Sequence, residues 1–413
     1  MAEGIRINPD RLWESILTMA RIGATRKGGC ARLALTDLDK QGRDLFVGWC
    51  KDAGCSIDID KMGNIFATRP GTSSMQPVMT GSHLDTQPTG GKFDGVYGVL
   101  AGLEVIRSLN EQHIDTQNPV QVVVWTNEEG SRFQPAMVGS GVLAGAFELS
   151  DIYDCQDVDG LRFEDELERI GYKGSKEVNP PEAIAYFEVH IEQGPILENA
   201  NDIIGVVTHQ QGIRWYTVTV TGQESHAGTT PMLLRKDALM TAAGIALKVK
   251  EIAMDHSPAG CGTVGMFDCY PGSPNTIPGK VVFSVDLRHP DNSTLERMES
   301  ALITFCDSFD NQCAIDIDAY WKYAPRAFDN TCIETVQNAA EHLGYCYQRM
   351  ITGAGHDASY MAQVIPTSMI FIPCKDGISH NELEYASKSD CAAGCNVLLQ
   401  SILKTAVEVS KSG

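Results

Sequence analysis

The sequence has no long hydrophobic run and no excess of basic residues. Among its 413 residues, no segment reaches the roughly 18 apolar residues of a membrane-spanning helix. The opening segment MAEGIRINPDRLWESI lacks the basic and then apolar regions of a secretory signal. Acidic residues outnumber basic ones by 53 to 33, and the net charge of −20 argues against nucleic acid or an anionic membrane as a partner. We therefore expect a soluble, acidic, cytoplasmic protein.

The 13 cysteines contain no C-x-x-C pair, and their number is odd. Cys391 and Cys395 stand four residues apart on an expected helix. Cytosolic proteins seldom keep disulfides, so we expect reduced and mostly structural thiols. This pattern excludes neither an enzyme nor a binding protein, but it argues against a zinc finger.

Apolar strands and helices alternate in the first and last parts of the chain. The strand PVMTGSHLD, the helix VYGVLAGLEVIRSLNEQ and the strand VQVVVWTNEEG follow one another. Continuous apolar strands joined by helices predict an α/β fold with a helix-covered, mixed, mainly parallel sheet. After about residue 210 the pattern of apolar residues changes, because RWYTVTVTGQ alternates apolar and polar residues as a half-exposed antiparallel strand does. The order of elements there predicts a small inserted α+β sandwich.

These patterns predict two domains, as the chain length also favours. Residues 1–211 and 328–413 are expected to form the catalytic domain, and residues 212–327 the inserted domain. The inserted domain leaves a sheet edge open, and the alternating strand RWYTVTVTG invites pairing with a second copy. We therefore expect a homodimer through the inserted domain.

Ionisable residues gather where the apolar strands of the α/β part end. The loops after these strands carry His83, Asp85, Asp94, Glu128, Glu129, His190 and His380. In open α/β sheets, sites form outside the carboxyl ends of the strands. We therefore expect these loops to build one shared site. The other histidines, His113, His209, His256, His289 and His342, are interpreted as structural, as most lone histidines are.

Imidazole and carboxylate groups without thiolate suit zinc, manganese or cobalt. Three histidines with two or three carboxylates exceed the needs of one catalytic ion, which favours two ions that share a carboxylate. Asp94 is the expected bridge, because its glycine neighbours let the backbone come close. Asp85 stands two residues from His83 and is expected to fix the tautomer of that imidazole.

The adjacent Glu128 and Glu129 need separate roles, because neighbouring side chains that leave a strand point in opposite directions. One can bind metal while the other serves as general base for a metal-held water. Most adjacent glutamates simply lie on a solvated helix face. This pair ends a strongly apolar strand, which favours the catalytic interpretation.

The series H-x-D, a later aspartate, E-E, a third ligand and a late histidine resembles the M20 metallopeptidase and amidohydrolase family. The segments HIEQGP, SHAGTTPM, GAGHDA and GISHN resemble its N-carbamoyl amino acid amidohydrolase branch, which includes allantoate amidohydrolase. The similarity runs from about residue 10 to 405. Within the branch, GSHLDTQPTGGKFDG, GVLAGLEVIR, LRKDAL, DLRHP and IPTSMIFIPCKDGISHNELEYAS are most similar to dimeric β-ureidopropionases (β-alanine synthases) of pyrimidine degradation.

The resemblance implies two divalent metal ions per subunit, with zinc expected first and manganese, cobalt or nickel as alternatives. His83, Asp94 and His190 would hold one ion, and Asp94, Glu129 and His380 would hold the other. Glu128 would be the general base. No expected ligand is missing, which argues against a non-catalytic binding module on this scaffold.

The resemblance also implies residues that contact the substrate. These are Gln193 at the carbamoyl group, His226 and Asn275 at the oxyanion from the partner subunit, Arg288 at the carboxylate, and Gly355 and His356 along the pocket. A guanidinium fork suits a carboxylate. Closure of the inserted domain as a lid would bring Arg288 to the substrate and exclude water.

The implied activity is hydrolysis of a linear, non-peptide C–N bond, with N-carbamoyl-β-alanine cleaved to β-alanine, CO2 and NH3. The alternatives are N-carbamoyl-L-α-amino acids or allantoate, because one methylene gives only about 1–3 kcal/mol of discrimination. A dipeptidase or aminoacylase is a remoter alternative. His190 argues against it, since the peptidases of the family more often have a carboxylate at that position.

Overall fold

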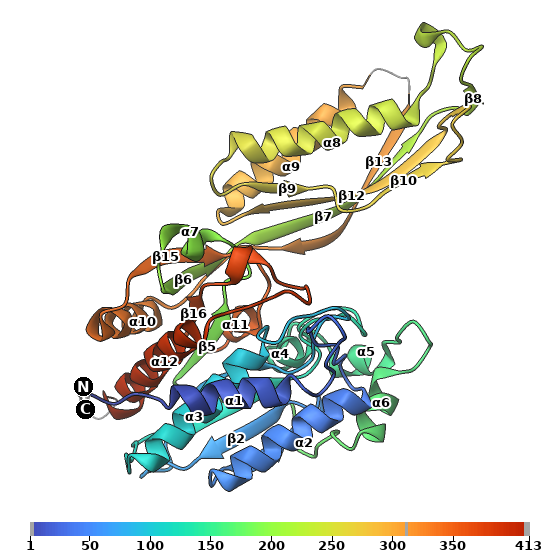
Figure 1. The fold of residues 1–413 in the computed structure, drawn as a ribbon. Coiled ribbons are helices and arrows are strands. Elements are labelled where there is room, and N and C mark those ends of the chain that lie inside the picture. Colours follow the sequence, from blue (N-terminus) through green and yellow to red (C-terminus); the bar gives the residue numbers. More distant parts are fainter. Residues whose placement is uncertain (1–3, 310–312, 409–413) are drawn as a thin grey trace. The chain divides into compact units, whose positions relative to one another are not determined.

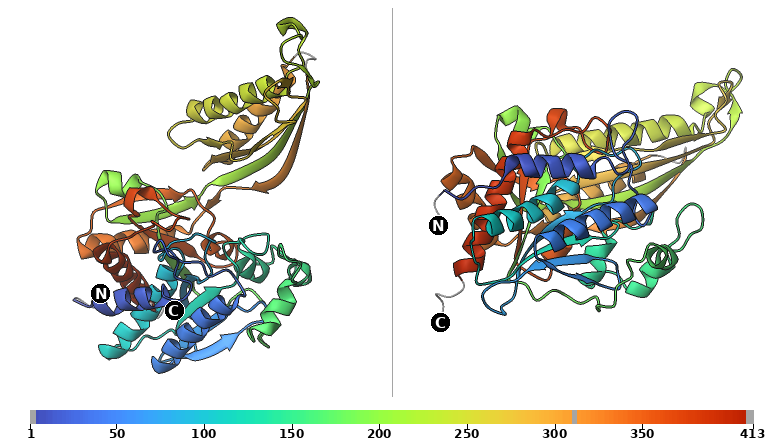
Figure 2. Two further views of the ribbon diagram at one scale, coloured as in Figure 1. Left: turned by 45° about the vertical axis from the view of Figure 1, so that its right-hand side comes forward. Right: turned by 60° about the horizontal axis from the view of Figure 1, so that its bottom comes forward.

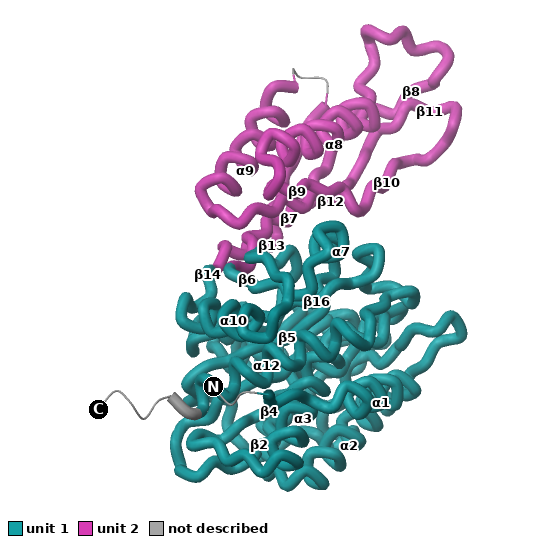
Figure 3. The backbone as a smooth tube through the Cα atoms, turned by 60° about the vertical axis from the view of Figure 1, so that its left-hand side comes forward, with its two compact units in different colours: residues 1–208, 327–413 teal, residues 209–326 magenta. Residues whose placement is uncertain are grey.

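The computed structural model describes residues 4–309 and 313–408. Within them the chain divides into two compact units at Thr208/His209 and at Arg326/Ala327 (Figure 3). Each unit has its own hydrophobic core. The roles expected for the two units, catalysis in one and a lid with dimerisation in the other, stay predictions.

The first unit is built on a mixed sheet with the strand order β1-β2-β4-β3-β5-β16-β6-β14, in which β15 also pairs with β6. Its strands are β1 (Ser56–Ile59), β2 (Ile65–Arg69), β3 (Val78–His83), β4 (Val120–Trp125), β5 (Ala185–Ile191), β6 (Ile204–Gln210), β14 (Arg326–Ala327), β15 (Tyr347–Thr352) and β16 (Thr367–Ile372). The central strands β4, β3, β5 and β16 run parallel. Strands β2 and β6 join the two sides of this centre in antiparallel pairs. This arrangement confirms the predicted α/β class.

The central parallel strands are buried on both faces. Every residue of β3, β5 and β16 is buried, because helices and loops cover both faces of the sheet centre. Helices α3, α10 and α12 pack against these strands, and α1 packs on α3 and α12 (Figure 1). The helices of this unit are α1 (Pro9–Met19), α2 (Asp37–Asp52), α3 (Val96–Glu111), α4 (Val138–Leu143), α5 (Leu149–Asp154), α6 (Phe163–Arg169), α7 (Ile196–Ala200), α10 (Asn330–Leu343), α11 (Asp357–Met361), η2 (Lys375–Gly377) and α12 (Lys388–Glu408).

The second unit is an antiparallel sheet with two helices on one face (Figures 1 and 2). Its elements are β7 (Gly212–Thr221), β8 (Ser225–His226), η1 (Met232–Leu234), α8 (Ala238–Asp255), β9 (Cys261–Thr263), β10 (Phe267–Tyr270), β11 (Thr276–Ile277), β12 (Lys280–His289), α9 (Asn292–Asp307) and β13 (Ala314–Tyr323). Buried and less buried residues alternate along β7 and β12, since one face packs on α8 and α9. The predicted α+β architecture of this segment is confirmed.

One expectation about this sheet is wrong. The strand RWYTVTVTG was expected to invite pairing with a second copy, but its residues 214–221 lie in β7, which pairs with β12 on one side and β13 on the other. Alternation reports that one face of a strand is covered, and it carries no information about hydrogen-bonded neighbours. The sheet order β10-β12-β7-β13, with β9 also paired to β12, leaves β13 at one edge and β9 and β10 at the other.

Two further observations concern the chain as a whole. All 13 cysteines are free thiols. Among the described residues, no helix combines the length and the apolar character that crossing a bilayer requires.

Candidate metal centre

Four loops at one edge of the sheet carry the predicted ligands. His83 ends β3, His190 lies one residue before the end of β5, Glu128 follows β4 and His380 follows β16. These four strands are parallel, so their carboxyl ends meet at one edge. Asp94 reaches the same place from the loop that leads into α3.

Gly95 lets the Asp94 loop approach His83 closely. Its φ is +65°, in the region that favours glycine, and a Cβ atom there would lie 2.3 Å from Nε2 of His83. A side chain at this position would collide with the imidazole. The glycine-rich stretch therefore positions Asp94 against the end of β3.

The two carboxylate oxygens of Asp94 face different histidines. Oδ1 lies 3.2 Å from Nε2 of His190 and 3.6 Å from Nε2 of His83. Oδ2 lies 3.3 Å from Nε2 of His380. These histidines hold the pKa of Asp94 well below its ordinary value, although burial opposes this effect. Asp94 thus stands between two groups of donors, as a bridging carboxylate does.

The backbone orients the two buried histidines. Nδ1 of His83 lies 2.8 Å from the carbonyl oxygen of Asp85, and Nδ1 of His190 lies 2.9 Å from that of Ile191. A carbonyl can only accept, so each Nδ1 carries a proton. Burial opposes protonation of Nε2, but the carboxylates beside it raise the pKa of both rings, and loss of that proton frees the Nε2 lone pair for a cation. The backbone N–H of Gly95 donates to Nε2 of His190 at 3.1 Å.

Asp85 contacts His83 through its main chain. Its main-chain carbonyl, and not its carboxylate, fixes the tautomer of His83. The buried carboxylate instead accepts the backbone N–H groups of Glu128 at 3.3 Å and Glu129 at 3.2 Å. Asp85 therefore holds the turn that presents the two glutamates.

Glu128 and Glu129 face different histidines. Oε2 of Glu128 lies 3.5 Å from Nε2 of His83, whereas Oε2 of Glu129 lies 3.5 Å from Nε2 of His380 and accepts a hydrogen bond from Gln87 at 2.6 Å. Burial raises the pKa of Glu128 well above its ordinary value. Burial, together with repulsion from Asp94, raises the pKa of Glu129 to about 7.

His380 and Gln193 complete the outer side of the cluster. The hydrogen bond to Asp94 raises the pKa of His380 to about 9, and Glu129 adds to this effect while burial opposes it. Nε2 of Gln193 donates to Oδ2 of Asp94 at 3.0 Å and lies 3.3 Å from Oγ of Ser379. Oε1 of Gln193 is buried and has no hydrogen-bond partner in the described part of the chain.

His356 lies behind His190, with 4.6 Å between the ring centroids and the rings set edge to face. Burial, reinforced by the nearby His190, holds the pKa of His356 well below its ordinary value, so this ring is neutral. Its buried Nε2 has no hydrogen-bond partner among residues 4–309 and 313–408. His356 thus lies beside the cluster and Gly355 precedes it in the chain, and their part in a substrate pocket stays a prediction.

The donor set fits divalent cations. The ligand atoms of His83, Asp94 and His190 all lie within 4.8 Å of one another, as do those of Asp94, Glu129 and His380. Carboxylates buried this closely repel one another, and a cation between them removes that repulsion. A third set, Glu188, His190 and His356, meets the same distance criterion.

The other predicted substrate residues lie in the second unit. His226 in β8 pairs with Thr276 in β11, directly after Asn275. Nδ1 of His226 accepts the backbone N–H groups of Gly228 at 3.0 Å and Thr229 at 3.3 Å, so a neutral ring carries its proton on Nε2 as a donor. The parts of His226 and Asn275 in the site stay predictions.

Arg288 lies near the end of β12 and is bound by a carboxylate of its own strand. Its Nε lies 2.9 Å and its Nη2 2.7 Å from Oδ2 of Asp286. Residues two apart on a strand share one face, which explains this pair. The expected contact of Arg288 with a substrate carboxylate stays a prediction.

Sequence reasoning missed two polar residues beside the cluster, Ser379 and Glu384. The carboxylate of Glu384 is buried and binds the backbone of Asp94 and the hydroxyl of Ser379. The segment NELEYAS gives no local signal that separates Glu384 from Glu382, because the contact comes from 290 residues away.

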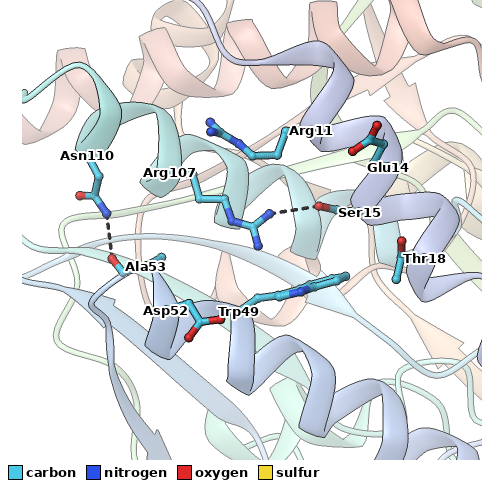
Figure 4. Close-up of a pocket in the computed structure, with 9 residues that line it drawn as sticks. All are labelled: Arg11, Glu14, Ser15, Thr18, Trp49, Asp52, Ala53, Arg107 and Asn110. Atoms are coloured by element: carbon cyan, nitrogen blue, oxygen red, sulfur yellow. Dashed lines mark hydrogen bonds between the residues drawn. The ribbon is translucent and has the colours of Figure 1, made fainter.

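A separate cavity of about 490 Å³ lies among α1, α2 and α3 (Figure 4). In it, Arg107 stacks over the ring of Trp49 at 5.4 Å and donates to Oγ of Ser15 at 3.0 Å. None of the predicted site residues lines it. We therefore do not interpret this cavity as the active site, because the candidate metal ligands do not line it.

The fold and the site define a hydrolase whose buried cluster suits divalent metal ions. The model of Peptidase family M20/M25/M40 matches residues 79–404, and the chain belongs to this family. An N-carbamoyl-L-amino-acid amidohydrolase of Rhizobium meliloti is 50% identical over 409 residues, which cover 98% of each chain. Allantoate amidohydrolase of Escherichia coli (strain K12) is 34% identical and covers 93% of this chain and 95% of its own.

Among solved structures, an amidase of the hydantoinase/carbamoylase family from Burkholderia multivorans is 54% identical with a TM-score of 0.94. The match covers 98% of this chain and 99% of that chain. The predicted family and the predicted class, a hydrolase of non-peptide C–N bonds, are confirmed.

Proposed function

We propose that this enzyme hydrolyses N-carbamoyl-L-α-amino acids to the free amino acid, CO2 and NH3. The 50% identity to an N-carbamoyl-L-amino-acid amidohydrolase over nearly the whole chain supports this substrate class. The relatives thus favour this alternative over N-carbamoyl-β-alanine, which stays an untested expectation. Allantoate is the second candidate, because the Escherichia coli relative bears that name.

The single observation that best supports the proposed metal-dependent reaction is that the two carboxylate oxygens of Asp94 face different histidines, His190 and His380. His83 and His190 would hold one divalent ion with its Oδ1, and Glu129 and His380 would hold another with its Oδ2. Zinc is the first expectation, and manganese, cobalt or nickel suit the same donors. When bound, the ions would polarise the attacking water and the carbamoyl oxygen.

Glu128 would be the general base. Its carboxylate faces the cluster beside His83, and its burial favours proton uptake. It would take one proton from the attacking water while the oxygen bonds to the carbamoyl carbon. It would then give that proton to the amino acid nitrogen as the C–N bond breaks, and the released carbamic acid would divide into CO2 and NH3.

The remaining contacts position the substrate. Gln193 would meet the carbamoyl group, since its buried Oε1 is free to accept. Gly355 and His356 would line the pocket. Arg288 would bind the substrate carboxylate, and Asp286 would hold its guanidinium in place. His226 and Asn275 would reach the oxyanion from the partner subunit of a homodimer.

A substrate panel tests the proposal. The metal-reconstituted enzyme is assayed with N-carbamoyl-L-methionine, N-carbamoyl-D-methionine, N-carbamoyl-β-alanine, allantoate and a dipeptide. We expect kcat/KM to be highest for the L-methionine derivative, with the D-enantiomer as the matched control for stereochemistry. A highest value for N-carbamoyl-β-alanine or allantoate would replace the proposed substrate, and hydrolysis of the dipeptide alone would contradict the reaction class.

A further inference from the structure

Glu384 lies between η2 and α12, and its side chain is buried. Its Oε1 accepts the backbone N–H groups of Phe93 at 3.0 Å and Asp94 at 3.1 Å. Its Oε2 accepts from Oγ of Ser379 at 2.9 Å. Gly91 makes room for this carboxylate, because a Cβ there would lie 2.0 Å from Oε1. One side chain thus ties the loop of Asp94 to the loop that ends in His380.

The hydroxyl of Ser379 can donate its proton to either of two carboxylates, Glu384 or Asp94. Its Oγ lies 2.9 Å from Oε2 of Glu384 and 3.2 Å from Oδ2 of Asp94. A hydroxyl has a single proton, so it can satisfy only one of them at a time. Oδ2 is also the oxygen that faces His380 at 3.3 Å. Gln193 also donates to Oδ2 at 3.0 Å, so a Ser379 proton donated to Glu384 leaves Oδ2 with one hydrogen-bond donor fewer in competition with a cation.

We propose that Glu384 is a positioning residue of the metal centre. It fixes the backbone of Asp94 and takes the Ser379 proton, so that Oδ2 of Asp94 stays available to the ion held with Glu129 and His380. This inference rests on the proposed metal centre and is independent of the proposed substrate. Orienting partners of this kind typically change metal affinity about 10–100-fold when they are removed.

The variant Glu384→Gln tests the proposal without a change in shape. The amide oxygen is needed where two backbone N–H groups converge, so the NH2 group must face Ser379. That NH2 group is a donor and turns the Ser379 proton toward Oδ2 of Asp94. We expect the weaker of two Mn²⁺ binding steps to shift about 10–100-fold, and the tighter step to stay within about twofold of wild type.

The measurement is a Mn²⁺ titration of chelator-treated protein, with bound metal counted after equilibrium dialysis. Glu382→Gln is the matched control, because its carboxylate lies in the same loop and faces the exposed Lys27 at 3.5 Å. Its Mn²⁺ binding should equal that of wild type. We expect the site of the half-exposed His380 to be the weaker one, because the side chains of His83 and His190 are buried. In a His380→Ala background, which removes a ligand of that site, Glu384→Gln should therefore have little further effect.

Ser379→Ala separates the effect of the Ser379 proton from the effect of the hydrogen bonds between Glu384 and the Asp94 backbone. Alone, it should bind Mn²⁺ within about twofold of wild type, because Glu384 still holds the Asp94 backbone. Combined with Glu384→Gln, it should restore part of the lost affinity, since no hydroxyl proton remains to block Oδ2. Thermal melting of the metal-free proteins checks that each variant folds, and Ser379→Ala still tests the proposal where Glu384→Gln does not fold.

Three outcomes would overturn the proposal. These are wild-type Mn²⁺ binding in folded Glu384→Gln, no gain in the double variant, or a tenfold or larger loss in Ser379→Ala alone. If wild type bound none of Zn²⁺, Mn²⁺, Co²⁺ and Ni²⁺ in the same titration, the metal centre would fail and the role of Glu384 with it. Two bound ions without turnover of the substrate panel would reject only the substrate, and the role of Glu384 would stand.

Discussion

Oε2 of Glu128 lies 3.5 Å from Nε2 of His83, and both side chains are buried. The carbonyl of Asp85 occupies Nδ1 of His83, so this imidazole meets Glu128 and Asp94 through Nε2 alone. Glu129, one residue further, meets His380 instead. The adjacent glutamates therefore serve opposite sides of the cluster, and each can be tested separately.

Glu128→Gln should lower turnover by about 10²–10⁴-fold, the usual contribution of a general acid–base group. The amide keeps the shape of the side chain but cannot take a proton. Bound metal, measured by elemental analysis, should stay nearly unchanged. Glu129→Gln is the matched control and should lose metal. If Glu128→Gln loses metal while Glu129→Gln retains it, the two roles are reversed.

Prolonged chelation should abolish turnover, because the clustered carboxylates and imidazoles have the character of metal ligands. Adding back Zn²⁺, Mn²⁺, Co²⁺ or Ni²⁺ one at a time should restore it, and the best ion identifies the working metal. Rates and bound metal are measured on the same samples. Full activity in rigorously metal-free protein would refute the centre.

The metal-free protein should lose stability as the pH rises. The folded pKa of Glu129 is about 7 against an ordinary 4.5, and that of His380 is about 9 against 6.5. A group whose pKa is raised on folding stabilises the folded state below its unfolded pKa, and this contribution disappears as the pH passes the folded value. Melting temperatures of the metal-free form should therefore fall between about pH 4.5 and 9.

Bound metal ions should reverse this fall in Tm with rising pH, because they displace the protons held by Glu129 and His380. The difference in Tm between Mn²⁺-loaded and metal-free protein should widen from pH 5 to pH 9. His380→Ala supplies the control, because it should flatten the alkaline part of the metal-free profile. A difference in Tm that narrows as the pH rises would contradict the assigned pKa shifts.

The central strands and the loops that carry the candidate ligands could be predicted from the sequence, because short local patterns determine them. Strands β3, β5 and β16 bury both faces, so a polar side chain inside them needs a buried partner, as Ser82 has in Glu188 at 2.7 Å. Ionisable residues are instead favoured where such strands end. His83 and His190 stand at such ends, and Asp94 lies between glycines that permit close approach. Their role as ligands stays a proposal.

The remaining features depend on contacts between distant residues. Whether β7 is an outer or a central strand depends on the positions of β12 and β13, which its own alternation does not report. The carboxylate of Asp85 meets the backbone of Glu128 and Glu129, more than 40 residues away in the chain, which the H-x-D spacing does not indicate. Glu384 acquires its role only when its loop meets Asp94.

The last prediction concerns the partner subunit. Each of Glu128→Ala and His226→Ala should be inactive as a homodimer. If His226 serves the site of the other subunit, a mixed dimer has one site with both defects and one intact site. Random reassortment makes about half the dimers mixed, so mixing should recover roughly a quarter of wild-type activity.

Proof of subunit exchange decides how the mixing result is understood. Exchange is measured independently by native mass or by capture through a tag on one variant, because dimers that never reassort would also recover nothing. The Nε2 donor of His226 is available for an oxyanion, since backbone N–H groups occupy Nδ1. If His226 acts within its own chain, every site in the mixture keeps one defect. Proven exchange without recovered activity would therefore exclude the cross-subunit role and leave His226 as a residue of its own subunit.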